Sequence, residues 1–422
     1  MSSRIAALSA SIQEHSSKID EYHRKNGIPQ PTFDPTEDSV AEVKYPDDIE
    51  KSRTEVLSAT MELSDLLTGP RGLVANPGFT ALTKFSMTRF IHHFNLVNRI
   101  PLDGDGMSYE DLAKDMNAGI SPSTLRQLLR AAMSFQMFQE KKPGYVSHSS
   151  VTRFLREHPV LHDCTGFTAE DMVPAFLGIV DALIENPAAD DPSKSGYMVA
   201  HNASEPSFYL HLAKDAEKIR RFRNCISHTS AGPQWSMHYL TDYFPWESFG
   251  NGTVVDVGGS TGTSMFAVAE RFPKLKLIVQ DMADAIAQAK QRPGVNVSHM
   301  VADFFQPQPV KDADVYFFRS VMHNWPDAGA AKILKAQIPA LKPGAKILIM
   351  DELMPNQKDM ALSTARLQRL MDLAMLALGN SKVRDEEGWR ELLKMADERF
   401  VLDRIIEPEG SALALVEVTW RP

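Results

Sequence analysis

The 422-residue chain is short of cysteine and of long apolar runs, and each shortage excludes a class of protein. Its only two cysteines, Cys164 and Cys225, are too few for a disulfide framework and too far apart for a CxxC metal pair. No uncharged apolar stretch approaches the roughly 20 residues that a transmembrane helix needs. Arg4 is followed by serine, glutamine and glutamate, not by the apolar core of a signal peptide. We therefore expect a cytoplasmic protein without a membrane partner.

Positive charge is also in short supply. Lysine and arginine total 45 against 54 acidic residues, which gives a formal net charge of -9. Broad nucleic-acid binding needs clustered basic side chains, so we expect no nucleic-acid partner. The composition is that of a globular protein, with 43% hydrophobic and 23% charged residues. A chain of this length is expected to form two domains or more.

The first segment, residues 1–50, is predicted to be an amphipathic helix followed by a proline-containing linker. Within residues 3–25 the apolar side chains recur at helical spacing: Ile5, Leu8, Ile12, Ile19 and Tyr22. Such a stripe needs a partner surface. Because a looser, proline-containing segment follows, we expect the helix to reach a second subunit and not to pack on its own domain.

Residues 51–165 are predicted to form a mostly helical domain. Within them, MSYEDLAKDMNAGISPSTLRQLLRAAM resembles a winged helix-turn-helix whose second helix is capped by Ser121. That helix presents only Arg126, Gln127 and Arg130 outward, which is a thin basic surface for DNA. We therefore expect a dimerisation module and not a DNA-binding regulator.

Residues 166–245 are predicted to be a helical connector between two domains. Apolar stripes predict one helix over 167–184 and another over 207–229. Most of these apolar side chains are expected to form ordinary core, and a few to line a substrate pocket.

From residue 246 to 422 the chain alternates between strands and helices. Five apolar segments are predicted strands: Thr253–Val257, Leu277–Gln280, Asn296–Met300, Val315–Phe318 and Lys346–Met350. The helical stretches between most of them predict an α/β fold with a doubly wound parallel sheet. Near the end, Phe400–Ile406 and Ala412–Thr419 are separated by only a short turn, which predicts an antiparallel hairpin.

A glycine-rich turn follows the first predicted strand. Gly258, Gly259 and Gly262 stand there, and glycine permits positive φ and a close approach of ligand to backbone. Asp281 ends the next strand, where a carboxylate can accept hydrogen bonds from a ribose diol. No glycine fills the first position of a G-x-G-x-x-G fingerprint, so the spacing disfavours nicotinamide and flavin cofactors.

Further polar and aromatic residues follow the third and fourth strands. Asp303 and Phe304 come after the third, where a carboxylate and a ring could hold an adenine. His323 comes after the fourth, at the edge where open α/β sheets bind ligands. A neutral imidazole there can take a proton from a phenol or enol near pH 7. Asp327, four residues on, follows a proline and fits a helix start, so we expect no metal at His323.

Together these motifs resemble a known family. The segments VVDVGGSTG, LIVQDM, VADFF, FFRSVMHNWPDAGAAKIL and LKPGAKILIMDELMP occur in the order typical of S-adenosylmethionine-dependent O-methyltransferases, of plant caffeate type and their fungal polyketide relatives. The resemblance covers roughly residues 55–420. It implies S-adenosyl-L-methionine as cofactor, a small-molecule substrate, a winged-helix homodimer with interlocked N-terminal domains, and a methyltransferase sheet that ends in the antiparallel hairpin.

The resemblance also implies roles for individual residues. It makes His323 the general base that deprotonates the acceptor hydroxyl, and Asp351 an acid that orients the ring. The implied cofactor contacts are Gly258, Gly259, Gly262, Asp281, Asp303, Phe304 and Arg319. The implied substrate contacts are Phe222, Ile226, Thr229, Met371 and Met375.

The chain departs from the family pattern beside the catalytic histidine. The family usually places a second acid in a segment reading KER, but this chain reads SKVRDEE, so Val383 stands in its place. Glu352 is expected to point to the opposite side of its strand from Asp351. Asn324 replaces a common aspartate, which we expect to be a minor change. Val383 keeps open a second reading, a pericyclase of secondary metabolism that uses this scaffold without transferring a methyl group.

Overall fold

The computed structural model describes residues 3–75, 77–355 and 362–422. The chain forms two compact units, and neither is a single continuous stretch. The first, the helical unit, comprises Met1–Val173, Asp215–His228 and Gln357–Arg369. The second, the sheet unit, comprises Pro174–Lys214, Thr229–Asn356 and Leu370–Pro422.

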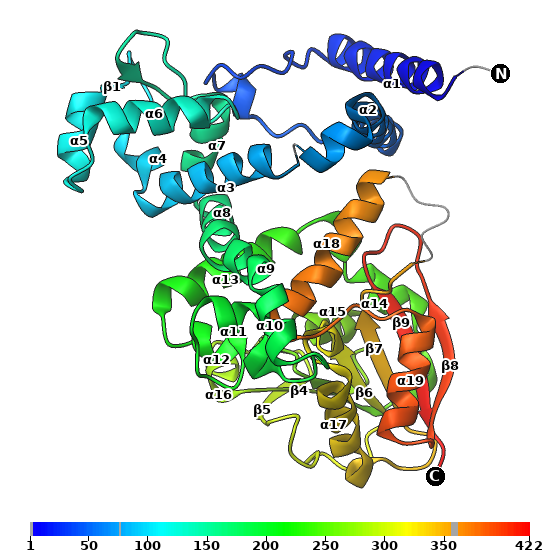
Figure 1. Ribbon diagram of the computed structural model, residues 1–422. Helices are drawn as coiled ribbons and strands as arrows, with labels where there is room; N and C mark the ends of the chain where they lie inside the picture. Colours follow the sequence, from blue (N-terminus) through cyan, green and yellow to red (C-terminus); the bar gives the residue numbers. More distant parts are fainter. Residues whose placement is uncertain (1–2, 76, 356–361) are drawn as a thin grey trace. The chain divides into compact units, whose positions relative to one another are not determined.

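The helical unit is built from helices and one short antiparallel ribbon (Figure 1). Its strands β1 (Met107–Ser108) and β2 (Tyr145–Val146) pair with each other. Its helices are α1 (Arg4–Asn26), α2 (Asp47–Ala75), α3 (Pro77–His93), α4 (Leu96–Arg99), α5 (Tyr109–Met116), α6 (Pro122–Met133), α7 (Ser150–Glu157), α8 (Pro159–Phe167) and most of α13 (Ala216–Thr229).

Helix α1 finds its partner within its own chain. It packs along α2, where the guanidinium of Arg4 pairs with Glu62 and the His15 ring contacts the Ser52 hydroxyl at 3.2 Å. Leu8, from the predicted stripe, is buried in this contact region. The helix therefore packs on its own unit, but α2 covers the stripe only in part, because Ile5 is 47% exposed. Contact of α1 with a second subunit stays a prediction.

The segment predicted to form a winged helix-turn-helix contains the helices α5 and α6, and α5 lies beside the short β1–β2 ribbon. Ser121 accepts a hydrogen bond from the backbone N–H of Thr124, as its predicted capping role requires. The outward arginines do not form a free basic surface, because Arg126 and Arg130 both pair with Glu140. Hydrogen bonds from Arg130 are the largest influence on Glu140, whose pKa falls to about 2.

The sheet unit contains a seven-stranded sheet in the order β5-β4-β3-β6-β7-β9-β8 (Figure 1). The first five strands in this order run parallel and the last two, the C-terminal hairpin, are antiparallel. The strands are β3 (Thr253–Val257), β4 (Lys276–Asp281), β5 (Val297–Val301), β6 (Val315–Arg319), β7 (Lys346–Asp351), β8 (Phe400–Ile406) and β9 (Ala414–Trp420). The predicted α/β fold with its terminal hairpin is confirmed.

Side-chain alternation along the strands gives the sheet two cores. On β7, Ile347 and Ile349 face one core, which α17 and α19 cover, while Leu348 and Met350 face the other, which α14 and α15 cover. The helices of this unit are α9 (Val173–Leu177), α10 (Ile179–Glu185), α11 (Gly196–Ala200), α12 (Phe208–Leu212), α14 (His238–Tyr243), α15 (Thr263–Arg271), α16 (Ala283–Ile286), α17 (Asp327–Gln337), α18 (Leu362–Gly379, whose first residues belong to the helical unit) and α19 (Glu386–Ala396).

Both long helices predicted for the connector are interrupted. The helix expected over 167–184 is divided into α8, a π-helical turn at Thr168–Met172, α9 and α10. Gly178 lies between α9 and α10, and glycine is required there because a Cβ would lie 2.4 Å from the Gly196 carbonyl oxygen. The helix expected over 207–229 is split into α12 and α13. None of the described helices has the length and apolar character needed to span a bilayer.

Candidate active site

The glycine turn after β3 is a tight backbone loop held by β4. The N–H groups of Gly258 and Gly259 both donate to the carbonyl oxygen of Gln280, at 2.8 and 3.0 Å. Gly258 has a φ of 77° and Gly262 a φ of 90°, a region that residues with a Cβ rarely adopt. The turn leads into the N-terminus of α15, where backbone N–H groups favour electron-rich ligands.

Asp281 closes this turn from the end of β4. Its Oδ2 accepts a hydrogen bond from the Ser260 N–H at 2.8 Å, and its Oδ1 accepts one from the Met282 N–H at 2.7 Å. The carboxylate is half-buried, and each oxygen retains a second lone pair. Two backbone N–H groups thus fix the carboxylate of Asp281 at the carboxyl end of β4.

Sequence reasoning missed a buried acid beneath the glycine turn, Asp256. Both of its carboxylate oxygens, and Nε of Arg319, are buried without a hydrogen-bond partner among the described residues. Burial raises the pKa of Asp256 to about 7, although the positive charge of Arg319 opposes this shift. A Cβ on Gly259 would lie 2.4 Å from the Asp256 carboxylate, so glycine is required there. The signal available in the sequence was an acid inside the apolar strand VVDV.

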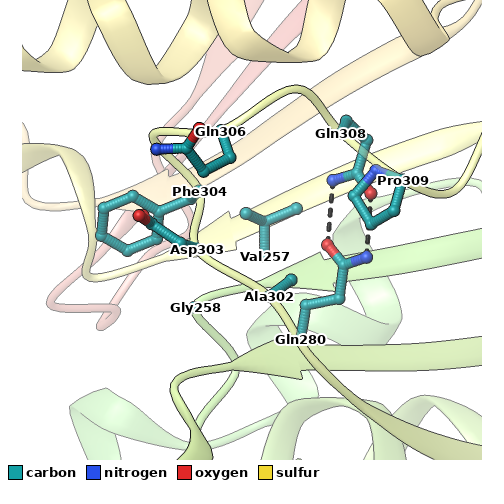
Figure 2. Close-up of a pocket in the computed structure, with 9 residues that line it drawn as sticks. All are labelled: Val257, Gly258, Gln280, Ala302, Asp303, Phe304, Gln306, Gln308 and Pro309. Atoms are coloured by element: carbon teal, nitrogen blue, oxygen red, sulfur yellow. Dashed lines mark hydrogen bonds between the residues drawn. The ribbon is translucent and has the colours of Figure 1, made fainter.

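A small hollow lies beside the turn (Figure 2). The Phe304 ring and the Asp303 carboxylate stand at one end of it, and the paired amides of Gln280 and Gln308 at the other. Oδ1 of Asp303 also accepts the Phe305 N–H at 2.9 Å. An aromatic face, a carboxylate and amides together suit a flat heterocycle with an amino group. The structure thus brings five of the predicted cofactor residues, Gly258, Gly259, Asp281, Asp303 and Phe304, to one edge of the sheet.

His323 lies in a short 3-10 turn, Met322–Asn324, directly beyond β6. Its backbone N–H donates to Oδ2 of Asp351 at 3.0 Å, and its Nδ1 is in ion-pair contact with Oδ1 of the same carboxylate. Asp351 ends β7, which neighbours β6 in the sheet, and its side chain is fully buried. One carboxylate therefore fixes both the backbone and the ring of His323, which leaves Nε2 as the ring nitrogen available for proton transfer.

The charge around His323 favours its protonated form. Burial lowers the pKa of the ring, but the negative charge of Asp351 and, to a smaller extent, that of Glu352 outweigh burial. The pKa of His323 therefore lies above its ordinary value. A histidine in this state is a stronger base than a free imidazole, provided the pH is high enough to deprotonate it.

Glu352 also contributes to the charge around His323. Its negative charge raises the pKa of His323, but less than that of Asp351 does. Burial raises the pKa of Glu352, and the charge of His323 opposes that shift. The strand β7 ends at Asp351, and the side that Glu352 faces stays a prediction.

The segment around Val383 holds the turn that carries His323, a role that its sequence did not indicate. Val383 is buried, and its N–H donates to Asp372 at 3.0 Å. The adjacent Arg384 is buried too and donates to the carbonyl oxygens of Met322 and Trp325, each at 2.9 Å, on either side of the His323 turn. It also pairs with Asp327 at the start of α17. Arg384 therefore holds the loop that carries the base.

Asn324 also has a specific role in this loop. Its side-chain oxygen accepts a hydrogen bond from the Tyr209 hydroxyl at 2.7 Å, and its amide donates to the Ser320 carbonyl at 2.9 Å. Ser320 has a left-handed backbone, with a φ of 53°. Asparagine can donate and accept at once, whereas an ionised aspartate could not donate to the Ser320 carbonyl.

The predicted substrate contacts are divided between the two units. Phe222 and Ile226 lie on α13 in the helical unit, where the Phe222 ring packs edge-on against Phe167 and Ile226 is half exposed. Thr229, at the end of α13, and Met371 and Met375, on α18, belong to the sheet unit. Each unit is described by itself, so their shared wall stays a prediction.

Comparison with known proteins agrees with the geometry. The O-methyltransferase domain family matches residues 194–397. The chain is 43% identical over 420 residues to O-methyltransferase gsfB of Penicillium aethiopicum, covering 100% of this chain and 99% of that protein. Among solved structures, OxaC in complex with sinefungin and meleagrin has a TM-score of 0.72 at 21% identity, covering 98% of this chain and 99% of that one. A structure described as a pericyclic reaction enzyme has a TM-score of 0.66 at 22% identity, covering 88% and 94%.

The chain therefore belongs to the S-adenosylmethionine-dependent O-methyltransferases, in a branch that includes fungal enzymes of secondary metabolism. It is an enzyme, and its cofactor is S-adenosyl-L-methionine.

The residues of the sheet unit fit that cofactor. A Cβ on Gly258 would fill the space beside Val321 and Phe304, at 3.0 and 3.7 Å, so this cradle depends on glycine. Asp281 would hold the ribose diol, and Asp303 with Phe304 would hold the adenine. The buried oxygens of Asp256, which have no hydrogen-bond partner among the described residues, lie under the turn.

Proposed function

We propose that this enzyme methylates a hydroxyl group of a small aromatic or polyketide-type metabolite, with His323 as the general base. The observation that carries the proposal is the contact of Asp351 with both the backbone N–H and the ring Nδ1 of His323. S-adenosylmethionine supplies an electrophilic methyl group when bound. The chain supplies a base whose orientation does not depend on the substrate.

A histidine base indicates how acidic the acceptor hydroxyl should be. An imidazole deprotonates a phenol or enol efficiently. The pKa of such a hydroxyl is closer to the pKa of the imidazole than the pKa of an aliphatic alcohol is. Asp351 offsets the positive charge that His323 gains as it takes the proton, and Glu352 adds a weaker contribution of the same sign. Arg319 lies on β6 next to the cofactor turn and faces Asp256, so we assign it to cofactor binding and not to proton transfer.

We place the acceptor against Phe222, Ile226, Thr229, Met371 and Met375. Aromatic, aliphatic and thioether side chains suit a flat apolar metabolite, and methionine adapts to irregular shapes.

We further propose that the enzyme is a homodimer joined through residues 51–165, with 166–245 as connector and 246–422 as catalytic domain. In support, α2 and α3 of the helical unit carry large apolar side chains in water, among them Leu67 at 67% and Phe79 at 71% exposure. Apolar surface of this kind is typical of an interface. Leu67→Glu combined with Phe79→Glu should give a monomer by light scattering. The low cysteine content supports the cytoplasm as its compartment.

The test combines binding with turnover. Calorimetry measures the affinity for S-adenosylmethionine and S-adenosylhomocysteine, and a radiolabelled methyl group is followed onto a panel of phenols and polyketides. Binding with label transfer that is lost in His323→Gln is the expected result. Tight cofactor binding without transfer to any acceptor would contradict the proposal and favour the pericyclase reading, for which Val383 is the residue of interest.

A further inference from the structure

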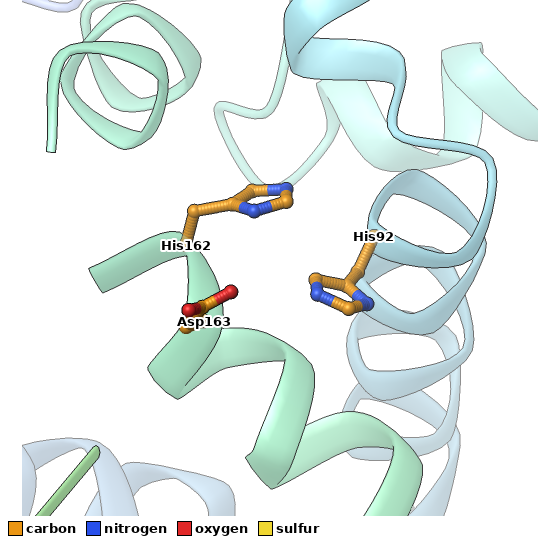
Figure 3. Close-up of side chains that lie close together, drawn as sticks. All are labelled: His92, His162 and Asp163. Carbon is orange, nitrogen blue, oxygen red and sulfur yellow. The ribbon is translucent and has the colours of Figure 1, made fainter. Parts of the chain in front are cut away.

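A cluster of potential metal ligands lies in the helical unit, apart from the residues assigned above. His92 comes from the last turn of α3, and His162 and Asp163 come from α8. One ligand atom from each of the three side chains lies within 4.8 Å of the others. Figure 3 shows the side chains directed into a shared space between the two helices, and the two imidazole centroids are 4.7 Å apart.

Both histidines have ring nitrogens without a partner. Nδ1 of His92 and Nε2 of His162 are buried and form no hydrogen bond within the part of the chain that the structure describes. His92 is only 9% exposed. A buried polar atom without a partner costs free energy unless a ligand satisfies it. Burial lowers the pKa of both rings, that of His92 to about 4.

Hydrogen bonds from α13 hold the Asp163 carboxylate in place. Oδ1 of Asp163 accepts a hydrogen bond from Arg220 at 3.0 Å, and Oδ2 accepts one from Asn224 at 2.6 Å, both from α13. Each oxygen keeps a further lone pair for a ligand. Hydrogen bonds of this kind commonly orient carboxylates that bind metals.

The local backbone makes room for the cluster. A Cβ on Gly166, one turn after His162, would lie 2.0 Å from Nε2 of His92, so only glycine admits this ring. The π-helical turn at 168–172 begins two residues later. Such turns are rare and frequently accompany functional sites.

We propose that His92, His162 and Asp163 bind a divalent transition metal of the Zn²⁺ type. Two imidazoles and a carboxylate are a common zinc ligand set and leave a fourth position for water. Ligand atoms around tetrahedral zinc are about 3.3 Å apart, so small side-chain rotations would bring these three into range. The bound ion joins the end of α3 to α8 and stabilises the helical unit.

The first experiment uses the full-length protein after metal removal. Titration with Co²⁺ is followed by its visible absorption, and titration with Zn²⁺ by calorimetry. We expect one ion per chain, the absorption of four-coordinate cobalt, and loss of that absorption when Zn²⁺ is added. The absence of stoichiometric binding would overturn the proposal and leave a neutral histidine pair that needs no ion.

Variants locate the site. His162→Gln and Asp163→Asn should each weaken Zn²⁺ binding at least about 100-fold, since a lost ligand costs more than a lost outer contact. The matched control is His238→Gln, which removes an exposed histidine of the sheet unit. Circular dichroism verifies that each variant folds. If one variant does not fold, the other still tests the site. Equal affinity in Asp163→Asn and in the control would refute the assignment.

Thermal unfolding gives a second readout. Zn²⁺ at about 100 times its Kd should raise the melting temperature of the metal-free wild type by about 5 °C. Neither ligand variant should respond, whereas His238→Gln should respond like wild type. The same shift in all four proteins would show that the ion binds elsewhere.

Discussion

Replacing Asp351 with asparagine tests how the enzyme sets its catalytic base. In the wild type, one carboxylate oxygen accepts the backbone N–H of His323 and the other contacts the ring Nδ1. The asparagine side chain has only one acceptor oxygen and replaces the other with an NH₂ donor. It can therefore satisfy the backbone or the ring of His323, but not both, and it carries no negative charge.

The size of the effect follows from the lost contact. A hydrogen bond to a charged group contributes about 1.5–3 kcal/mol. At about 1.4 kcal/mol per factor of ten, kcat should fall about 10- to 100-fold. The pH dependence should also change. Methyl transfer needs neutral His323, so the rate rises with pH through the pKa of that residue. Because Asp351 raises this pKa, its removal should move the rising limb to lower pH.

The assay is the pH profile of kcat/KM with saturating S-adenosylmethionine. Glu352→Gln should move the limb in the same direction by less, because Glu352 contributes less to the pKa of His323 than Asp351 does. Glu386→Gln is the matched control, since that exposed acid on α19 pairs with Arg390 on the same helix. It should change neither kcat nor the pH profile. If Asp351→Asn kept the wild-type kcat and the rising limb of its pH profile stayed at the same pH, the role of Asp351 in setting the base would be refuted.

Three further predictions concern single side chains. His323→Gln should abolish methyl transfer while calorimetry finds nearly unchanged S-adenosylmethionine affinity; a collapse of both would remove support for the base. Burial lowers the pKa of His148 to about 4, so the folded protein holds this ring in its neutral form. The shift corresponds to about 3 kcal/mol of unfolding free energy, which is fully present above about pH 6.5 and is lost as the pH falls toward 4. Calorimetric melting should be less pH-dependent in His148→Gln over that window, and an unchanged pH dependence would count against this. Arg384→Ala should lower the unfolding free energy by about 3 kcal/mol, because it removes the hydrogen bonds of a buried guanidinium to two carbonyl oxygens and its ion pair with Asp327. Urea titration measures the change, and a loss below about 1 kcal/mol would be inconsistent with this role.

The parallel sheet could be predicted from sequence because its strands are short, apolar and bounded by turns. The bounds of β3 and β8 were predicted to the residue, and β4 to β7 within about two residues. The glycine turn, Asp281 and His323 followed, since ligands bind beyond the carboxyl ends of parallel strands.

What the sequence did not reveal depends on contacts between distant segments. The effect of Glu352 on the pKa of His323 depends on charge and burial that no local sequence pattern shows. Arg384 stood beside the anomalous Val383, but its link to the His323 turn exists only after α19 packs on the sheet. The pairing of α1 with α2 and the meeting of His92 with His162 likewise join segments that no local pattern connects.

The interleaving of the two units has a consequence for how the enzyme can be made. The helical unit takes α13 and the first residues of α18 from late in the chain; Arg221 of α13 pairs with the buried Asp171, and Arg366 of α18 pairs with Asp65. A fragment that stops after Val173 lacks both helices. During synthesis the helical unit thus remains incomplete until residue 369 has left the ribosome, by which time five of the seven strands of the large sheet have emerged. The helical unit, although it begins the chain, therefore cannot be completed before most of the large sheet has been synthesised.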